Sequence, residues 1–137
     1  MIVGIGTDIV EINRIRDAVE KWGDRFLKKI FTDNEIAYCN QKKDSYPHLA
    51  ARFAAKEAVI KASSPLRDTR LAFHAIEILN EPSGRPFIKI LNSKPFTLNS
   101  FVIHLTLTHE RNYAVATVVI DRNPQLKNST QSAGSLQ

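Results

Sequence analysis

Glu57 is a carboxylate at a position where a core residue is expected. The stretch RFAAKEAVIKA, residues 52–62, predicts an alanine-rich helix, and Glu57 falls within its apolar stripe at about 100° per residue. Burying a carboxylate is costly unless an opposite charge compensates it. Lys61, four residues on, could provide that charge in an i,i+4 ion pair. A divalent cation would also explain why the pair lies on the apolar face.

A metal site needs a second carboxylate, because Mg²⁺ takes one or two protein carboxylates and often shares a substrate phosphate. Asp8, in GIGTDIV, is the candidate, since it follows a strand interrupted by glycines. Alternatively, Asp8 caps a helix that begins near Glu11. The glycines form neither a dinucleotide fingerprint nor a P-loop.

The other polar residues that could belong to a functional site could equally have a purely structural role. Arg52 and Lys56 are like charges at i,i+4, and an anion between them would relieve their repulsion. The pattern by itself favours two solvated side chains. His109 ends a predicted strand, where a lone histidine is more often structural than catalytic. The histidines have no partners at zinc-ligand spacing, and Cys39 carries no signature of a nucleophile.

The composition describes a basic domain without obvious membrane features. The 137 residues suit one domain, and 43% of them are hydrophobic. No apolar run reaches the ~20 residues that span a bilayer, and the N-terminus does not resemble a signal peptide. A single cysteine permits no intramolecular disulfide, so we expect a cytoplasmic protein that does not bind membranes. The formal net charge of +5 favours an anionic partner.

The first half of the chain is predicted to be mainly helical. Residues 2–6 read as a strand that ends in a close backbone approach. Residues 11–22 predict an amphipathic helix with Trp22 on its apolar face, continued after Gly23 and Asp24. The sequence TDNE at 32–35 has the form of a capping box before a helix to about residue 40. Pro47 suits the first turn of the long helix that ends near residue 62.

The second half predicts two β-hairpins, formed by residues 75–79 with 86–90 and by 101–109 with 113–120. A short piece near 94–99 lies between them. The fold class is therefore α+β, with the long helix packed on a mostly antiparallel sheet. From Asp121 the sequence turns polar, and we expect residues 123–137 to form a disordered tail outside the 1–122 domain.

Three stretches together resemble the holo-acyl carrier protein synthases of the 4′-phosphopantetheinyl transferase superfamily. They are GIGTDIVEINRI, RFAAKEAVIKA and HLTLTHERNYAVATVVI, and FTDNE at 31–35 and SGRPFI at 83–88 also match. The resemblance covers roughly residues 1–122. It implies transfer of phosphopantetheine from coenzyme A to a serine of an acidic acyl carrier protein, with release of 3′,5′-ADP, in fatty acid biosynthesis.

The resemblance also implies roles for individual residues. Asp8 and Glu57 would hold Mg²⁺, for which Mn²⁺ could substitute, and Lys61 would contact the phosphates. Glu57 is a candidate base, acting directly or through a water. The residues expected to hold coenzyme A are Arg52, Lys61, His109, Gly84, Pro86 and one or both of Lys42 and Lys43. Gly84 and Pro86 would border the nucleotide of a neighbouring subunit, because the bacterial short form is a homotrimer with sites at its interfaces.

A basic helix face is the expected docking surface for the carrier. Arg14 matches a family position that docks the carrier, and the surface would extend over Lys21, Arg25 and Lys28. The alternative is a solvated face.

One segment departs from the family, whose members usually have a G-T-G type turn after K-A. Here the chain reads KASSPLRDTRLAF, without glycine and with Pro65, Arg67 and Arg70. This departure leaves the shape of the nucleotide pocket open.

Two other classes of protein are alternatives to the enzyme. A nucleic-acid-binding module is not expected, because no RNP-like strand or GXXG loop is evident and aromatic residues make up only 8%. An inactive relative that only binds coenzyme A or the carrier would have no reason to keep Asp8, Glu57 and Lys61. Either alternative predicts no turnover.

Overall fold

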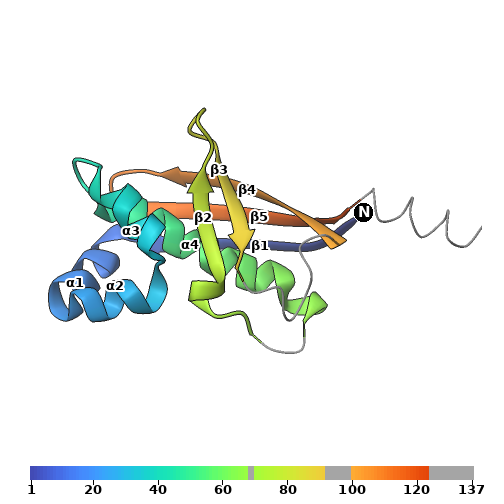
Figure 1. The fold of residues 1–137 in the computed structure, drawn as a ribbon, viewed down its shortest axis with the longest axis horizontal. Coiled ribbons are helices and arrows are strands. Elements are labelled where there is room, and N and C mark those ends of the chain that lie inside the picture. Colours follow the sequence, from blue (N-terminus) through green and yellow to red (C-terminus); the bar gives the residue numbers. More distant parts are fainter. Residues whose placement is uncertain (68–69, 92–99, 124–137) are drawn as a thin grey trace, which may run out of the picture.

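Helix α4 (Tyr46–Ser63) lies across one face of an antiparallel sheet, and the other elements pack around it (Figure 1). The computed structural model describes residues 1–67, 70–91 and 100–123. The elements before α4 are β1 (Ile2–Glu11), α1 (Ile12–Trp22), α2 (Asp24–Ile30) and α3 (Asp33–Asn40). Those after it are the 3₁₀ turns η1 (Ser64–Leu66) and η2 (Phe73–Ala75) and the strands β2 (Ile76–Asn80), β3 (Pro86–Ile90), β4 (Phe101–His109) and β5 (Tyr113–Arg122).

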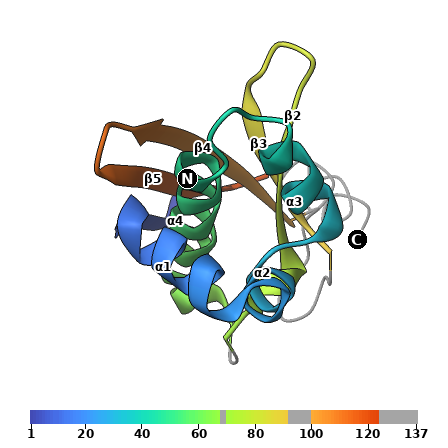
Figure 2. The same cartoon turned by 90° about the vertical axis from the view of Figure 1, so that its left-hand side faces the viewer.

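The main sheet has the strand order β1-β5-β4, and both pairs are antiparallel. Helix α4 packs chiefly on β1 and β5, while α1 covers one of its sides and α3 joins it to β2. The second sheet is the β2–β3 hairpin, whose tip projects away from the rest of the molecule (Figures 1 and 2). The predicted α+β class, the long helix on an antiparallel sheet and both hairpins are confirmed.

The backbone of β1 approaches that of α4 closely at two glycines. A Cβ added to Gly4 would lie 2.0 Å from the carbonyl oxygen of Ala62, and one added to Gly6 would lie 2.2 Å from that of Ala58. The predicted close approach is therefore confirmed. The predicted end of the strand near residue 6 is wrong, because β1 continues to Glu11 in register with β5.

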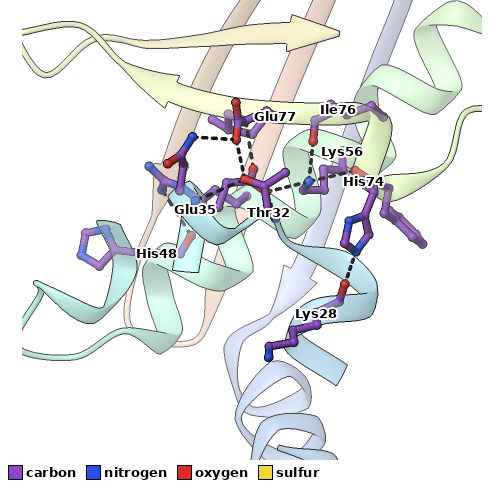
Figure 3. A network of polar contacts seen from close by, with 12 residues as sticks. Lys28, Thr32, Glu35, His48, Lys56, His74, Ile76 and Glu77 are labelled. Atoms are coloured by element: carbon purple, nitrogen blue, oxygen red, sulfur yellow. Dashed lines mark hydrogen bonds and ion pairs between the residues drawn. The ribbon is translucent and has the colours of Figure 1, made fainter. Parts of the chain in front are cut away.

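The capping box predicted at Thr32 is present, and it leads into a buried polar network (Figure 3). Glu35 accepts a hydrogen bond from the backbone N–H of Thr32 at 2.8 Å and pairs with Lys56 Nζ at 2.8 Å. Both side chains of that ion pair are fully buried. Lys56 also donates to the carbonyls of Phe73 at 2.9 Å and Ile76 at 2.5 Å. The interpretation of Lys56 as a solvated side chain is wrong, because its ammonium fastens α4 to α3, η2 and β2.

Burial lowers the pKa of Lys56, and the adjacent Glu35 carboxylate opposes that shift. Glu77, also buried, accepts hydrogen bonds from the Thr32 hydroxyl at 2.6 Å and from Asn34 Nδ2 at 3.3 Å. These contacts satisfy charged groups that would otherwise be costly to bury.

One further expectation needs correction. Trp22 does not lie in the core, because half of its surface is exposed, whereas Ile12 and Ile15 of the same helix are buried. Asp121 belongs to β5, and its Oδ1 lies 2.9 Å from the N-terminal ammonium. The piece near 94–99 and residues 124–137 of the predicted tail lie outside the described residues.

The contact between β1 and α4 predicts a large loss of stability for Gly6→Ala. The added methyl group would overlap a helix carbonyl, so strand and helix must separate, at a cost of about 3 kcal/mol or more. Urea unfolding followed by circular dichroism measures this loss. Thr7→Ala is the matched control on the exposed side of the same strand. It removes the hydroxyl that donates to the Ala116 carbonyl at 3.0 Å and lies 3.2 Å from Thr117 Oγ1, a loss of about 1–2 kcal/mol at this exposed position. Equal stabilities for the two variants would contradict the packing constraint.

Candidate active site

The register of β1 on α4 brings the carboxylate of Asp8 to the side chains of the helix. Asp8 follows Gly6 by two residues, so both point to the sheet face that α4 covers. Lys61 Nζ lies 2.9 Å from Asp8 Oδ1 and donates to the Thr7 carbonyl at 3.0 Å. Asp8 is therefore not a helix cap. Lys61 pairs with Asp8 across the two elements, and not with Glu57 in the predicted i,i+4 pair.

Glu57 pairs with a different basic side chain from the one that pairs with Asp8. Its Oε1 lies 3.6 Å from Arg70 Nη2, and its side chain keeps 23% of its exposure. Arg70 comes from the glycine-free segment that follows α4. The charge that compensates Glu57 within the described chain is thus an arginine from outside the helix.

Asp8 and Glu57 face the same cavity, which has a volume of about 350 Å³. The other described residues that line it are mostly apolar and include the basic Arg14: Ile9, Val10, Arg14, Ile15, Ala18, Phe26 and Phe53. The two carboxylates fit a hard divalent cation, because each one is charge-paired with an exposed cation that a metal ion can displace. Within residues 1–67, 70–91 and 100–123, no group of three or more His, Cys, Asp or Glu residues gathers as a metal cluster.

Besides the carboxylate site, a second cluster of polar side chains surrounds Arg52. The Arg52 side chain is only 3% exposed, so the interpretation of Arg52 as a solvated side chain is wrong. Its guanidinium lies 4.2 Å from the centre of the Tyr38 ring and donates to Asn80 Oδ1 at 2.6 Å. Lys42 Nζ lies over the same Tyr38 ring at 4.7 Å. Arg52 Nε is buried and has no hydrogen-bond partner in the described part of the chain.

Two histidines complete this second cluster. The rings of His48 and His109 meet edge to face, with centroids 5.7 Å apart. The pKa of His48 is lowered, first by burial and then by the positive charges of Arg52 and His109. An anion bound here would find several cationic or hydrogen-donating groups converging on it.

The β2–β3 hairpin is tied to the second cluster through Asn80. Asn80 Nδ2 donates to the carbonyl of Gly84 at 3.0 Å, while its Oδ1 accepts from Arg52. Pro86 is the partner of Asn80 in the strand ladder. Of the residues predicted to hold coenzyme A, the structure therefore gathers Arg52, His109, Lys42, Gly84 and Pro86. Lys43 is exposed in the loop before α4.

The two clusters lie on different sides of α4. On a helical wheel, Arg52 and His48 are about 140° and 180° away from Glu57. Asp8 belongs to β1 and His109 to β4, with β5 between them. Among the described residues of one chain, helix α4 thus lies between the carboxylate site and the second cluster.

The predicted docking residues are exposed on α1 and α2. Lys21 Nζ and the Arg25 guanidinium lie 5.0 and 6.0 Å from the centre of the Trp22 ring. Arg14 lies at the wall of the carboxylate cavity. Lys28 has an exposed side chain, and its carbonyl accepts a hydrogen bond from His74 Nε2 (Figure 3). The basic face therefore runs from the cavity to an exposed tryptophan.

Comparison with known proteins identifies the family to which this chain belongs. The model of the 4′-phosphopantetheinyl transferase superfamily matches residues 4–118. A holo-[acyl-carrier-protein] synthase of Halothermothrix orenii is 46% identical over 122 residues, which cover 87% of this chain and 97% of that protein.

Two of the solved structures that share this fold are from bacterial relatives. One is a holo-(acyl-carrier-protein) synthase from Bacillus anthracis in complex with coenzyme A (3′,5′-ADP), with a TM-score of 0.71, 36% identity and coverage of 90% of this chain and 99% of that chain. The other, from Neisseria meningitidis, has a TM-score of 0.77 and 32% identity, and it covers 89% of this chain and 100% of that chain. The chain belongs to the 4′-phosphopantetheinyl transferase superfamily and, within it, to the holo-[acyl-carrier-protein] synthases.

Sequence reasoning missed Tyr38, Asn80 and the pairing of Arg70 with Glu57. Tyr38 and Asn80 are ordinary residues at the end of a helix and a strand, and only the tertiary fold brings them to Arg52. Arg70 was noted as part of a departure from the family pattern, but nothing in its spacing points to Glu57.

Proposed function

We propose that this chain transfers the 4′-phosphopantetheine group of coenzyme A to a serine of an apo-acyl carrier protein, in a Mg²⁺-dependent reaction that releases 3′,5′-ADP. The observation that carries the proposal is the pair of carboxylates, Asp8 and Glu57, facing one cavity beside Lys61 and Arg14. Family membership and the coenzyme A complex of the Bacillus anthracis relative support the choice of substrate. The expected setting is fatty acid biosynthesis in the cytoplasm.

Asp8 and Glu57 would hold Mg²⁺, which when bound neutralises phosphate oxygens and favours departure of the nucleotide. Lys61 keeps a positive charge beside the phosphates when its ammonium leaves Asp8. The carrier serine oxygen attacks the phosphorus attached to the pantetheine arm, and the bond from that phosphorus to the nucleotide breaks. Glu57 takes the serine proton, directly or through a water.

The second cluster is the proposed holder of the nucleotide end of coenzyme A. Arg52, His109 and Lys42 supply positive charge or donors for a phosphate, and the unpartnered Arg52 Nε offers a further donor. Lys43 extends this charge into solvent. The hairpin residues Gly84 and Pro86 would border the nucleotide, because Asn80 links the hairpin to Arg52.

The active assembly is proposed to be a homotrimer with its sites between subunits. Coenzyme A must reach both clusters, but α4 separates them within one chain, so a neighbouring subunit would supply the second cluster. The sheet face opposite α4 also exposes apolar side chains, including Ile5 at 68% and Ile9 at 63%, with Val102 and Tyr113 nearby on β4 and β5. Large apolar side chains exposed together on one sheet face are typical of protein interfaces.

Mass spectrometry of an apo-acyl carrier protein incubated with the chain, coenzyme A and Mg²⁺ tests the reaction. We expect the carrier to gain one phosphopantetheine, and EDTA to prevent that gain. Asp8→Asn and Glu57→Gln should each lower the rate by about 10²–10⁴-fold, because they remove a metal ligand or the base. Asp33→Asn, an exposed carboxylate on α3, is the control. Full activity of either site variant, with its fold intact by circular dichroism, would rule out the metal assignment.

Reversing the charge of Arg14 tests the docking face formed by Arg14, Lys21, Arg25 and Lys28. Arg14→Glu should raise KM for the acidic carrier about fivefold or more at low salt, and the difference should shrink as salt is added. Because Arg14 also lines the carboxylate cavity, the affinity for coenzyme A is measured on Lys21→Glu, at a residue that does not line it, and should there stay within about twofold of the wild type. Arg122→Glu, the same change at the far end of β5, is the control. Identical carrier kinetics in the two variants at low salt would refute docking by this face.

Sedimentation equilibrium at micromolar concentration tests the assembly. The expected mass is that of three chains, and Ile5→Asp should convert the trimer to smaller species because it places charge on the apolar sheet face. Glu20→Lys, a charge reversal at an exposed position of α1, is the control. A wild-type monomer with full activity would show that one chain completes the site.

A further inference from the structure

Arg70 is a cation at the proposed metal site that comes from the segment in which this chain departs from its family pattern. It lies between η1 and η2, and its Nη2 is 3.6 Å from Glu57 Oε1. The guanidinium also lies 5.7 Å from the centre of the Phe73 ring. Phe73 stacks on Phe53, a residue of the cavity wall, with ring centroids 5.6 Å apart. An aromatic pair therefore supports Arg70 beside the cavity.

The two carboxylates of the cavity are neutralised separately. Asp8 has Lys61 at 2.9 Å, and Glu57 has Arg70 at 3.6 Å. Both cations are largely exposed, with 53% of the Lys61 side chain and 62% of the Arg70 side chain accessible. Ion pairs with exposed partners are weak, and long basic side chains change position at little cost. Each cation can therefore leave its carboxylate without disturbing the fold.

A divalent cation shared by Asp8 and Glu57 would take the place of both basic groups. Lys61 and Arg70 would then stand with Arg14 around a cavity whose carboxylate charges are already neutralised by the metal. That excess of positive charge opposes metal binding alone and favours an anion that arrives with it. Arginine is well suited to receive such an anion, because its planar guanidinium binds phosphate oxygens through two parallel hydrogen bonds.

We propose that Arg70 exchanges partners during substrate binding: it neutralises Glu57 in the free enzyme and binds the pyrophosphate of coenzyme A when a divalent cation takes Glu57. This inference rests on the proposed function, since it uses the same carboxylates and substrate. Because the exchange links the two ligands, the metal ion and coenzyme A strengthen each other's binding by the same factor. Arg70 is thus a substrate-binding residue and, in the free enzyme, a competitor of the metal ion.

Two binding constants, measured on the full-length chain, test the exchange without turnover. Electron paramagnetic resonance of free Mn²⁺ gives the affinity for the metal in the absence of coenzyme A, and calorimetry in saturating Mg²⁺ gives the affinity for coenzyme A. We expect Arg70→Ala to tighten Mn²⁺ binding about twofold to fivefold, the range of an exposed ion pair, and to weaken coenzyme A binding at least as much. Arg70→Lys keeps the charge and should leave Mn²⁺ binding close to that of the wild type. Arg122→Ala, an exposed arginine at the far end of β5, should change neither constant.

The possible outcomes separate this inference from the proposed function. Tighter Mn²⁺ binding together with weaker coenzyme A binding, in Arg70→Ala only, supports the exchange. If Mn²⁺ binds the wild type and Arg70→Ala equally, Arg70 does not compete and the exchange is wrong, while the metal site stands. If Mn²⁺ binding tightens but coenzyme A binding is unchanged, the transfer of Arg70 to phosphate is wrong. If neither protein binds Mn²⁺ with or without coenzyme A, the metal assignment itself fails, and the exchange with it.

Discussion

The contact between the backbone of β1 and the carbonyls of α4 is the constraint on which the site depends. Because Gly4 and Gly6 have no side chains, the strand lies directly against the turns of the helix that contain Ala58 and Ala62. The next residue on the same strand face is Asp8, and the same part of the helix carries Glu57 and Lys61. A wider separation would open the distance between the two carboxylates, so the geometry proposed to hold a metal ion is set by main-chain packing.

The other side of α4 is fixed by charge rather than by close packing. The buried Lys56–Glu35 pair connects the helix to α3, and Lys56 reaches the carbonyls that lead into β2. A buried pair of this kind adds little net stability, but the loss of one partner is severe because the other charge remains buried. These contacts therefore fix both the position of α4 and its rotation about its own axis. As a result, the carboxylate site and the second cluster stay on their separate sides of the helix.

Much of the fold was accessible from sequence because local signals agree with the tertiary structure. The capping box at Thr32, Pro47 at the start of α4 and the two turn-separated hairpins are all present where the patterns predicted them. The errors arise where distant residues decide the outcome. Nothing near Lys56 in the sequence shows that Glu35 will meet it in the core. In the same way, the match of Asp8 and Glu57 to a family motif could not reveal that Lys61 and Arg70 would be their separate partners.

Helix α4 also limits how this protein can vary over evolutionary time. One side tolerates only small residues against β1, another holds a buried charge, and the remaining sides carry the two clusters. Few positions of the helix are left where a substitution would be neutral. Adaptation to a different carrier or to different metal availability is then expected to proceed through the segments that border the helix. The connection after α4, which supplies Arg70, is one such place, because it borders the carboxylate site without being part of the helix.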